Sequence, residues 1–160
     1  MAVKYDIENF FDDVLVVLRA NINTKLAAID TDKNDGITLE TVNTDAYFFQ
    51  TMATQMANFG VFVYVGVGEI EGDPSPYAYV SQKFSADVVV ILSDDGNDPN
   101  IMKRLLRYHR ALIEIFQTNF DKISKVGKIK ISSLSPFPIE VMDRPTLSRG
   151  IGVSLEVHLA

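Results

Sequence analysis

Residues 58 to 68 read Asn58-Phe-Gly-Val-Phe-Val-Tyr-Val-Gly-Val-Gly68, a run dominated by β-branched and aromatic side chains. Valine occupies every second position from Val61 to Val67, and Phe62 and Tyr64 lie between the valines. Successive side chains of a strand point to opposite faces of its sheet. The pattern therefore predicts a β-strand that is apolar on both faces near its middle.

A second long apolar run follows this strand along the chain. Residues 77 to 92 end in Val88-Val-Val-Ile-Leu92 and favour another strand. The intervening residues, Glu69 to Pro76, contain glycine and proline breaks and predict an exposed loop. We expect the two strands to form an antiparallel hairpin with a protruding tip. Upstream, Tyr47-Phe-Phe49 fits either a short strand or a helical turn.

Helical periodicity appears on both sides of the hairpin. Apolar residues recur at helical spacing over residues 6 to 29, and the polar stretch Asp30 to Gly36 is expected to end that helix in a turn. A second helix is predicted over residues 99 to 119. The preceding turn, Ser93 to Pro99, is suited to cap its start.

The C-terminal third favours further strands. Residues 128 to 134 are a strand candidate, Pro136 and Pro138 impose an extended segment typical of a sheet edge, and residues 150 to 159 alternate with only one apolar face. We therefore expect a single domain, residues 1 to 160, of the α+β class. It should have a mostly antiparallel sheet with a long hairpin and two helices packed on one face.

Charge is divided unevenly along the chain. Residues 1 to 100 hold sixteen acidic and five basic side chains, whereas residues 101 to 160 hold five acidic and ten basic ones, for a net charge of −6. Opposite patches can attract each other across copies of the chain, and a head-to-tail contact of that kind can close into a ring. Alternatively, the two halves neutralise each other within one molecule.

The sharpest charged cluster lies on the second predicted helix. Helical spacing places Lys103, Arg107 and Arg110 on one face, with Arg104 beside them. This cluster is a candidate docking face for the acidic half of a neighbouring copy, or for DNA phosphates. The alternative is an ordinary solvated helix face.

The hairpin tip is the second candidate interface. Glu69, Glu71, Asp73 and Tyr77 lie in or beside it. The tip could be an arm that reaches onto a neighbour, where strand edges can pair with a partner sheet. A flexible hairpin loop is the alternative.

Motifs for chemistry are weak in this sequence. The stretch from Asp30 to Ile37 superficially resembles a calcium-binding loop, but its glycine and glutamate are out of frame. Gly66 to Gly72 follows a strand, as a nucleotide loop would, yet Pro74 and Pro76 follow where a helix should begin. His109 and His158 are the only histidines and are expected at the surface. We therefore predict no catalytic, metal or cofactor site, and a protein that is not an enzyme.

Composition limits the classes further. The chain has no cysteine, so disulfides and thiolate metal sites are excluded. No signal peptide is predicted, because acidic residues interrupt the N-terminal apolar positions. Residues 46 to 68 carry no charge, but polar side chains within them argue against a membrane span. The overall acidity argues against non-specific nucleic-acid binding by the whole surface.

The order of these elements resembles one protein family. A long helix over residues 6 to 29 precedes the hairpin at 58 to 92, the helix that contains Arg107-Tyr-His-Arg-Ala-Leu-Ile113, and the final strand Gly150-Ile-Gly-Val-Ser-Leu-Glu-Val157. This layout resembles the small tail-terminator and tail-completion proteins of long-tailed bacteriophages. The resemblance covers most of the chain and is one of layout, because that family has no catalytic motif to match.

The resemblance implies a structural virion protein of the tail or neck, present in the host cytoplasm during assembly. Such a protein would form a hexameric ring at the head-proximal end of the tail, stop polymerisation of the tail tube and join tail to head. Its partners would be its own copies, tail-tube subunits and head-connector or neck subunits, and DNA would at most pass through or near it. Another neck or head-completion subunit, or a small monomeric ligand- or peptide-binding module, remains the alternative.

Overall fold

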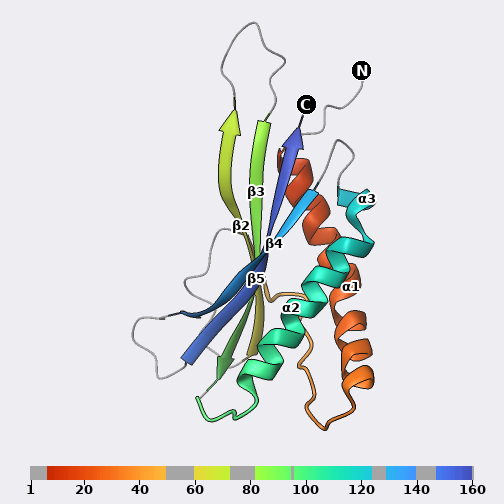
Figure 1. Cartoon of the computed structure of the whole chain (residues 1–160), viewed down its shortest axis with the longest axis vertical. Coiled ribbons are helices and arrows are strands. Elements are labelled where there is room, and N and C mark those ends of the chain that lie inside the picture. Colours follow the sequence, from red (N-terminus) through yellow and green to blue (C-terminus); the bar gives the residue numbers. More distant parts are fainter. Residues whose placement is uncertain are drawn as a thin grey trace, which may run out of the picture.

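The computed structural model describes residues 7–49, 60–72, 82–94, 96–123, 129–139 and 147–159. These residues form the elements α1 (Ile7–Lys33), β1 (Tyr47–Phe49), β2 (Gly60–Gly72), β3 (Gln82–Asp94), α2 (Ile101–Thr118), α3 (Phe120–Ile123), β4 (Ile129–Ile139) and β5 (Leu147–Leu159). The predicted α+β class is confirmed, because α1 and α2 lie on one face of a mostly antiparallel sheet (Figure 1).

Within the described residues, the sheet has five strands in the order β1-β2-β3-β5-β4. The predicted hairpin is its centre, and β2 pairs antiparallel with β3, with Val63 opposite Val90. Strand β3 pairs antiparallel with β5, and β5 pairs antiparallel with β4. The ambiguous segment Tyr47–Phe49 is a strand, and it pairs parallel with β2.

The predicted loop from Glu69 to Pro76 is wrong over its first residues. Strand β2 continues to Gly72, and Ile70 pairs with Phe84. A β-bulge between Val67 and Ile70 accommodates one extra residue of β2 without ending its pairing with β3. There the Glu69 N–H donates to Ser85 Oγ at 2.9 Å. The rest of that predicted loop, and the start of the second strand at residues 77–81, lie outside the described residues.

The first helix is longer than its apolar pattern indicates. The predicted end at residue 29 is wrong, because α1 continues through the polar residues to Lys33. It ends where Asn34 takes a left-handed conformation, with φ of 44°, and its N–H donates to the Asp30 carbonyl at 3.0 Å. Asparagine tolerates this conformation better than most residues, so the chain leaves the helix there.

The chain after α1 is fastened to the helices by hydrogen bonds. Asn23 of α1 pairs with the backbone of Val42 in both directions: its Nδ2 donates to the carbonyl at 3.0 Å, and its Oδ1 accepts from the N–H at 2.8 Å. The Asp30 carboxylate accepts from the N–H of Leu39 at 3.0 Å. The connection between α1 and β1 is therefore held against α1 by hydrogen bonds.

Strand β4 forms one edge of the sheet, as the two prolines predicted. It is longer than the predicted strand and includes Pro136 and Pro138, with a register shift between Leu134 and Phe137. Proline lacks an N–H and so cannot complete a ladder on both sides, which suits an edge position.

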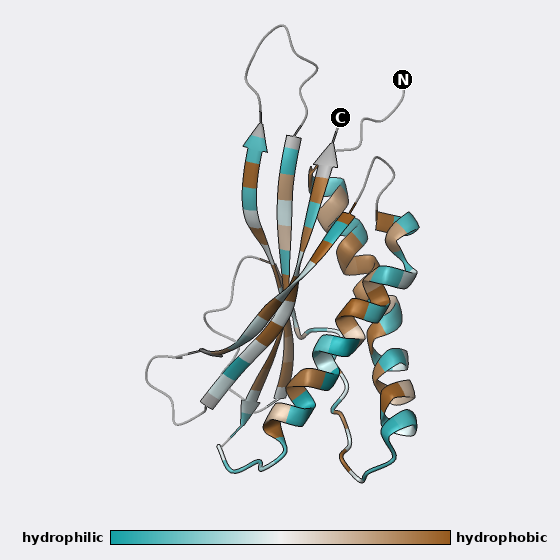
Figure 2. Cartoon of the chain, viewed as in Figure 1, coloured by the Kyte–Doolittle hydropathy of each residue, from teal (hydrophilic) through white to brown (hydrophobic). Residues whose placement is uncertain are grey.

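The main core lies between the sheet and the helices. Alternate residues of β3, from Phe84 to Leu92, face the helices, and the ring of Phe10 packs edge-on against Phe84 at 5.0 Å between centroids. Figure 2 shows the corresponding alternation of apolar and polar residues along the strands. A second, smaller apolar cluster occupies the opposite side of the sheet around Val89 and Ile91. We call the side away from α1 and α2 the distal face.

Candidate protein-protein interface

Arg107, at the centre of the predicted basic face, is buried, with 6% of its surface exposed. Its guanidinium holds the Asp35 carboxylate with both terminal nitrogens: Nη1 donates to Oδ1 at 3.0 Å and Nη2 donates to Oδ2. Nη1 also donates to the carbonyl of Ile37 at 3.2 Å. The hydrogen bond from Arg107 lowers the pKa of Asp35 to about 2, and the same bond raises the pKa of Arg107.

Arg110, one turn further along α2, belongs to a chain of ion pairs. Its Nη1 lies 2.8 Å from Asp32 Oδ2, and its Nε lies 2.7 Å from Glu114 Oε1. Glu114 also lies 3.3 Å from Lys25 of α1. Hydrogen bonds from Arg110 lower the pKa of both Asp32 and Glu114. All four groups are partly open to water, so these pairs fix geometry more than they stabilise the fold.

Arg104 and Lys103 complete the predicted cluster. Arg104 forms an ion pair with Asp98, at 2.8 Å between Nε and Oδ2, and its Nη1 donates to the carbonyl of Thr38. Lys103 is exposed, and within the described part of the chain it alone of the four has no carboxylate partner. Three of the four basic residues are thus neutralised within the molecule. For these residues, the opposite charges of the two halves of the chain pair within one copy and not between copies.

The acidic residues in the last turn of α1 and in the turn after it also have partners within the molecule. Asp32 and Asp35 are bound by arginines, and Asp30 accepts the N–H of Leu39. The calcium-loop resemblance of this stretch therefore reflects carboxylates that already have protein partners. Sequence spacing missed the arginine partners because they lie on α2, and Arg107 comes 72 positions after Asp35.

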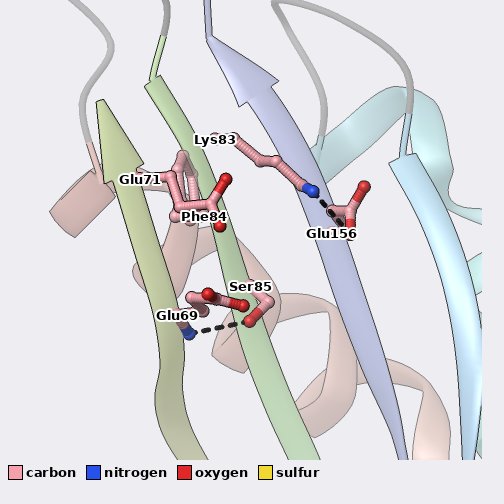
Figure 3. A pocket seen from close by; sticks show the side chains of 6 residues that line it. All are labelled: Glu69, Glu71, Lys83, Phe84, Ser85 and Glu156. Atoms are coloured by element: carbon pink, nitrogen blue, oxygen red, sulfur yellow. Dashed lines mark hydrogen bonds and ion pairs between the residues drawn. The ribbon is translucent and has the colours of Figure 1, made fainter. Parts of the chain in front are cut away.

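The acidic residues at the hairpin end lie on the distal face. Glu69 and Glu71 of β2 are exposed and line a shallow pocket with Lys83, Phe84, Ser85 and Glu156 (Figure 3). Lys83 forms an ion pair with Glu156 of β5, at 3.5 Å between Nζ and Oε2. The structure therefore places two of the four predicted tip residues, Glu69 and Glu71, beside an ion pair that joins β3 to β5. Asp73 and Tyr77 lie outside the described residues.

His109 has a neighbour that the sequence does not reveal. Its Nε2 lies 2.9 Å from the hydroxyl of Ser133 on β4. Burial lowers the pKa of His109 below its ordinary value. Within the described residues, no group of histidine and carboxylate side chains has the arrangement of a metal site. The side chain of His158 lies outside what the structure describes.

Two further pockets formed by described residues are small. One, of about 260 Å³, lies between the lower ends of β2 and β3 and the start of α2, where Arg104 and Tyr108 contribute to its wall. Another, of about 240 Å³, lies between α1 and α2 around Lys25 and Glu114. Both are below the roughly 300–1,000 Å³ of typical sites for drug-sized ligands. The distal face and sheet edges are therefore the stronger candidates for a functional surface.

Comparison with known proteins gives no family assignment. No protein-family model matches the chain, and no curated protein sequence matches it. Among the described residues, no helix combines the length and the apolar character needed to cross a bilayer.

Proposed function

We propose that this protein is a structural subunit that acts by assembling with copies of itself into a ring, rather than by turning over a substrate. The observation that carries this proposal is the one-sided sheet: α1 and α2 cover one face, and the described elements leave the distal face and the outer edge of β4 without a covering helix (Figure 1). Unpaired strand edges are sites at which further chains can add.

The charge of the distal face supports a ring through which DNA could pass. Carboxylates outnumber ammonium groups on the described part of this face, which carries Glu69, Glu71, Asp87 and Glu156 against Lys83 and Lys130. DNA affinity arises largely from basic groups that neutralise phosphates. A ring lined by this face would therefore let DNA pass without holding it.

The resemblance in element order gives the proposal a specific place. We propose the head-proximal end of a phage tail, where a hexameric ring ends tail-tube polymerisation and joins the tail to head-connector subunits. The order of helix, hairpin, helix and terminal strands supports this assignment. The assignment requires no catalytic group from the chain.

The ion pairs of the arginines argue against the basic face of α2 as the surface that forms the ring. Arg104, Arg107 and Arg110 have partners within their own molecule, so a neighbour would have to displace those carboxylates to use them. Of the cluster, Lys103 is the residue best placed for outside contacts. The hairpin end and the sheet edges are the better candidates for the contact between copies.

Native mass spectrometry across protein concentration tests the ring. We expect a hexamer at low salt that loses subunits as ionic strength rises, because salt screens exposed charge pairs. A strict monomer at every concentration would overturn self-assembly and favour the monomeric binding module. Immunogold labelling of virions that contain the chain tests its place: label at the head-tail junction supports the neck, and label elsewhere overturns it.

A further inference from the structure

We propose that copies of this chain join edge to edge, with β4 of one copy beside the end of β2 of the next, Ile70–Gly72. The inference rests on the proposed ring and names the contact that closes it. No described element pairs with Ile70–Gly72 on the side away from β3, or with Ile129–Leu134 on the side away from β5. Both segments lie at the same end of the sheet, because Ile70 and Ile129 share one row through Phe84 and Val157.

Strand direction fits this contact without turning either copy over. The order β2-β3-β5-β4 is antiparallel at every step, so β2 and β4 run in opposite directions. Two copies with the same orientation would therefore bring β4 of one antiparallel to β2 of the other. Such a contact uses two different surfaces and repeats head to tail, and this geometry generates rings when the rotation closes.

On the distal face, acidic and basic side chains alternate from β2 to β4, and this alternation also favours the proposed contact. Glu71 of β2 pairs in register with Lys83 of β3, Lys83 contacts Glu156 of β5, and Glu156 pairs in register with Lys130 of β4. The row runs from a carboxylate at one edge to an exposed ammonium group at the other. Placing β2 of the next copy beside β4 continues the alternation, because Lys130 then meets Glu69 and Glu71 of the neighbour.

The other face of the same edges is apolar and also complementary. Ile70 shares the helix side of the sheet with Phe84, yet 55% of its surface is exposed. Ile129 and Ile131 of β4 lie on the same side and are only half-buried at the margin of the core. Edge-to-edge contact would cover these three isoleucines together, so both faces of the junction match.

The other ends of the β2 and β4 edges are less open to a neighbouring strand, and this limits where the contact can form. Strand β1 covers β2 from Val63 to Val65. Pro136 and Pro138 remove N–H donors from the corresponding part of β4. Of the β2 and β4 edges, the described elements therefore leave open the end that carries Glu71 and Lys130.

Engineered disulfides test the contact directly, because the chain has no cysteine of its own. The variant with both Glu71→Cys and Lys130→Cys should give, after oxidation, a ladder of covalent multimers up to six on non-reducing gels. A bond within one chain is excluded, since β2 and β4 are three strand spacings apart, roughly 14 Å, and a disulfide needs Cα atoms within about 7 Å. The companion variant Glu69→Cys with Lys130→Cys covers the neighbouring register.

Controls separate this contact from others. Glu71→Cys combined with Lys103→Cys, on the exposed face of α2, should give no ladder. A ladder from this control, or dimers from Lys130→Cys alone, would overturn the proposed pairing. Native hexamers that yield no ladder from either edge pair would overturn the edge contact and leave the ring intact. Monomers throughout would overturn both.

Charge reversal of exposed side chains gives a second readout. Circular dichroism must check the fold of each variant, because Glu71 and Lys130 also face charged partners in their own sheet. Lys130→Glu should weaken assembly about tenfold, as should Glu69→Lys with Glu71→Lys. Combining all three changes in one chain should restore assembly, since the junction then carries the opposite pair. Failure of the combined variant to recover, with each variant folded by circular dichroism, would contradict the charge pairing.

Discussion

Arg107 and Asp35 form a bidentate ion pair that joins the middle of α2 to the turn after α1, across 72 residues of sequence. The arginine is almost fully buried, and the aspartate is the carboxylate that neutralises it. A buried charge without a partner is costly, whereas a well-aligned pair is tolerated. The contact therefore fixes how the chain leaves α1 and where it lies against α2.

The Arg107–Asp35 pair should make stability depend on pH in a defined window. The Arg107 hydrogen bond lowers the pKa of Asp35 from 3.8 to about 2. Because the folded-state pKa is the lower one, the ionised carboxylate stabilises the fold above about pH 4, and this contribution is lost as the pH falls towards 2. Urea midpoints of the parent and Asp35→Asn should differ at pH 6 and converge near pH 2.

An exposed aspartate in the same segment provides the control for the pH dependence assigned to Asp35. Asp45→Asn, which alters an exposed carboxylate in the same connecting segment, should leave the midpoints close to those of the parent. A gap between parent and Asp35→Asn that stays constant from pH 6 to pH 2 would show that ionisation of Asp35 is not the cause.

The double hydrogen bond between Asn23 and Val42 should be a measurable part of stability. Asn23→Ala leaves the N–H and carbonyl of buried Val42 without these partners. We expect a loss of about 1–2 kcal/mol in the free energy of unfolding, measured by urea denaturation. Asn21→Ala is the matched control, because the side chain of Asn21 donates to the carbonyl of Val17 in its own helix. Its change should be near zero, since alanine favours a helix; equal losses in both variants would contradict the role of Val42.

Local pattern predicted the strands and helices well, because their burial repeats with the period of the element. The alternation around Val63 and the proline-marked edge at Pro136 both appear in the sheet as expected. The pattern failed at element ends, where the deciding contacts are not periodic. Strand β2 passes Gly68 because a bulge and the hydroxyl of Ser85 accommodate it. Helix α1 continues past Ile29 because polar residues are compatible with its exposed last turn.

The candidate site was harder to predict than the fold. Helical spacing identified Arg104, Arg107 and Arg110 as neighbours on α2, but spacing carries no information on what faces them. Their carboxylate partners include Asp32 near the end of α1, Asp35 in the turn after it and Asp98 before α2, and the tertiary packing of α2 on α1 brings most of them together. Alternating charge across four strands was equally invisible, because register between distant strands cannot be read from one sequence.

Removal of the Tyr108 hydroxyl should destabilise the fold without disturbing its packing. The buried hydroxyl donates to the carbonyl of Glu40 at 2.6 Å, and burial raises the pKa of Tyr108 well above its ordinary value. Tyr108→Phe leaves that carbonyl without its donor, and we expect a loss of about 1–3 kcal/mol in unfolding free energy. Tyr47→Phe serves as control, because Arg19 lies 5.1 Å from the ring centre and needs no hydroxyl. An unchanged Tyr108→Phe variant would show that water replaces the bond.

Replacement of Gly152 should destabilise the sheet at the point where β5 pairs with β3. A β-carbon at this position would overlap the backbone oxygen of Val88 and lie 2.9 Å from the Cα of Val89. Both neighbours are backbone atoms of a central strand, so no side-chain rotation relieves the overlap, and the strands would have to separate. We expect Gly152→Ala to lose about 1–3 kcal/mol or more in unfolding free energy, as overpacked cores do. Ser154→Ala changes the next residue on the same face of β5 and should remain close to the parent in thermal denaturation. Equal melting temperatures for Gly152→Ala and the parent would mean that the sheet relaxes there, and that the close approach of β5 to β3 is not required for the fold.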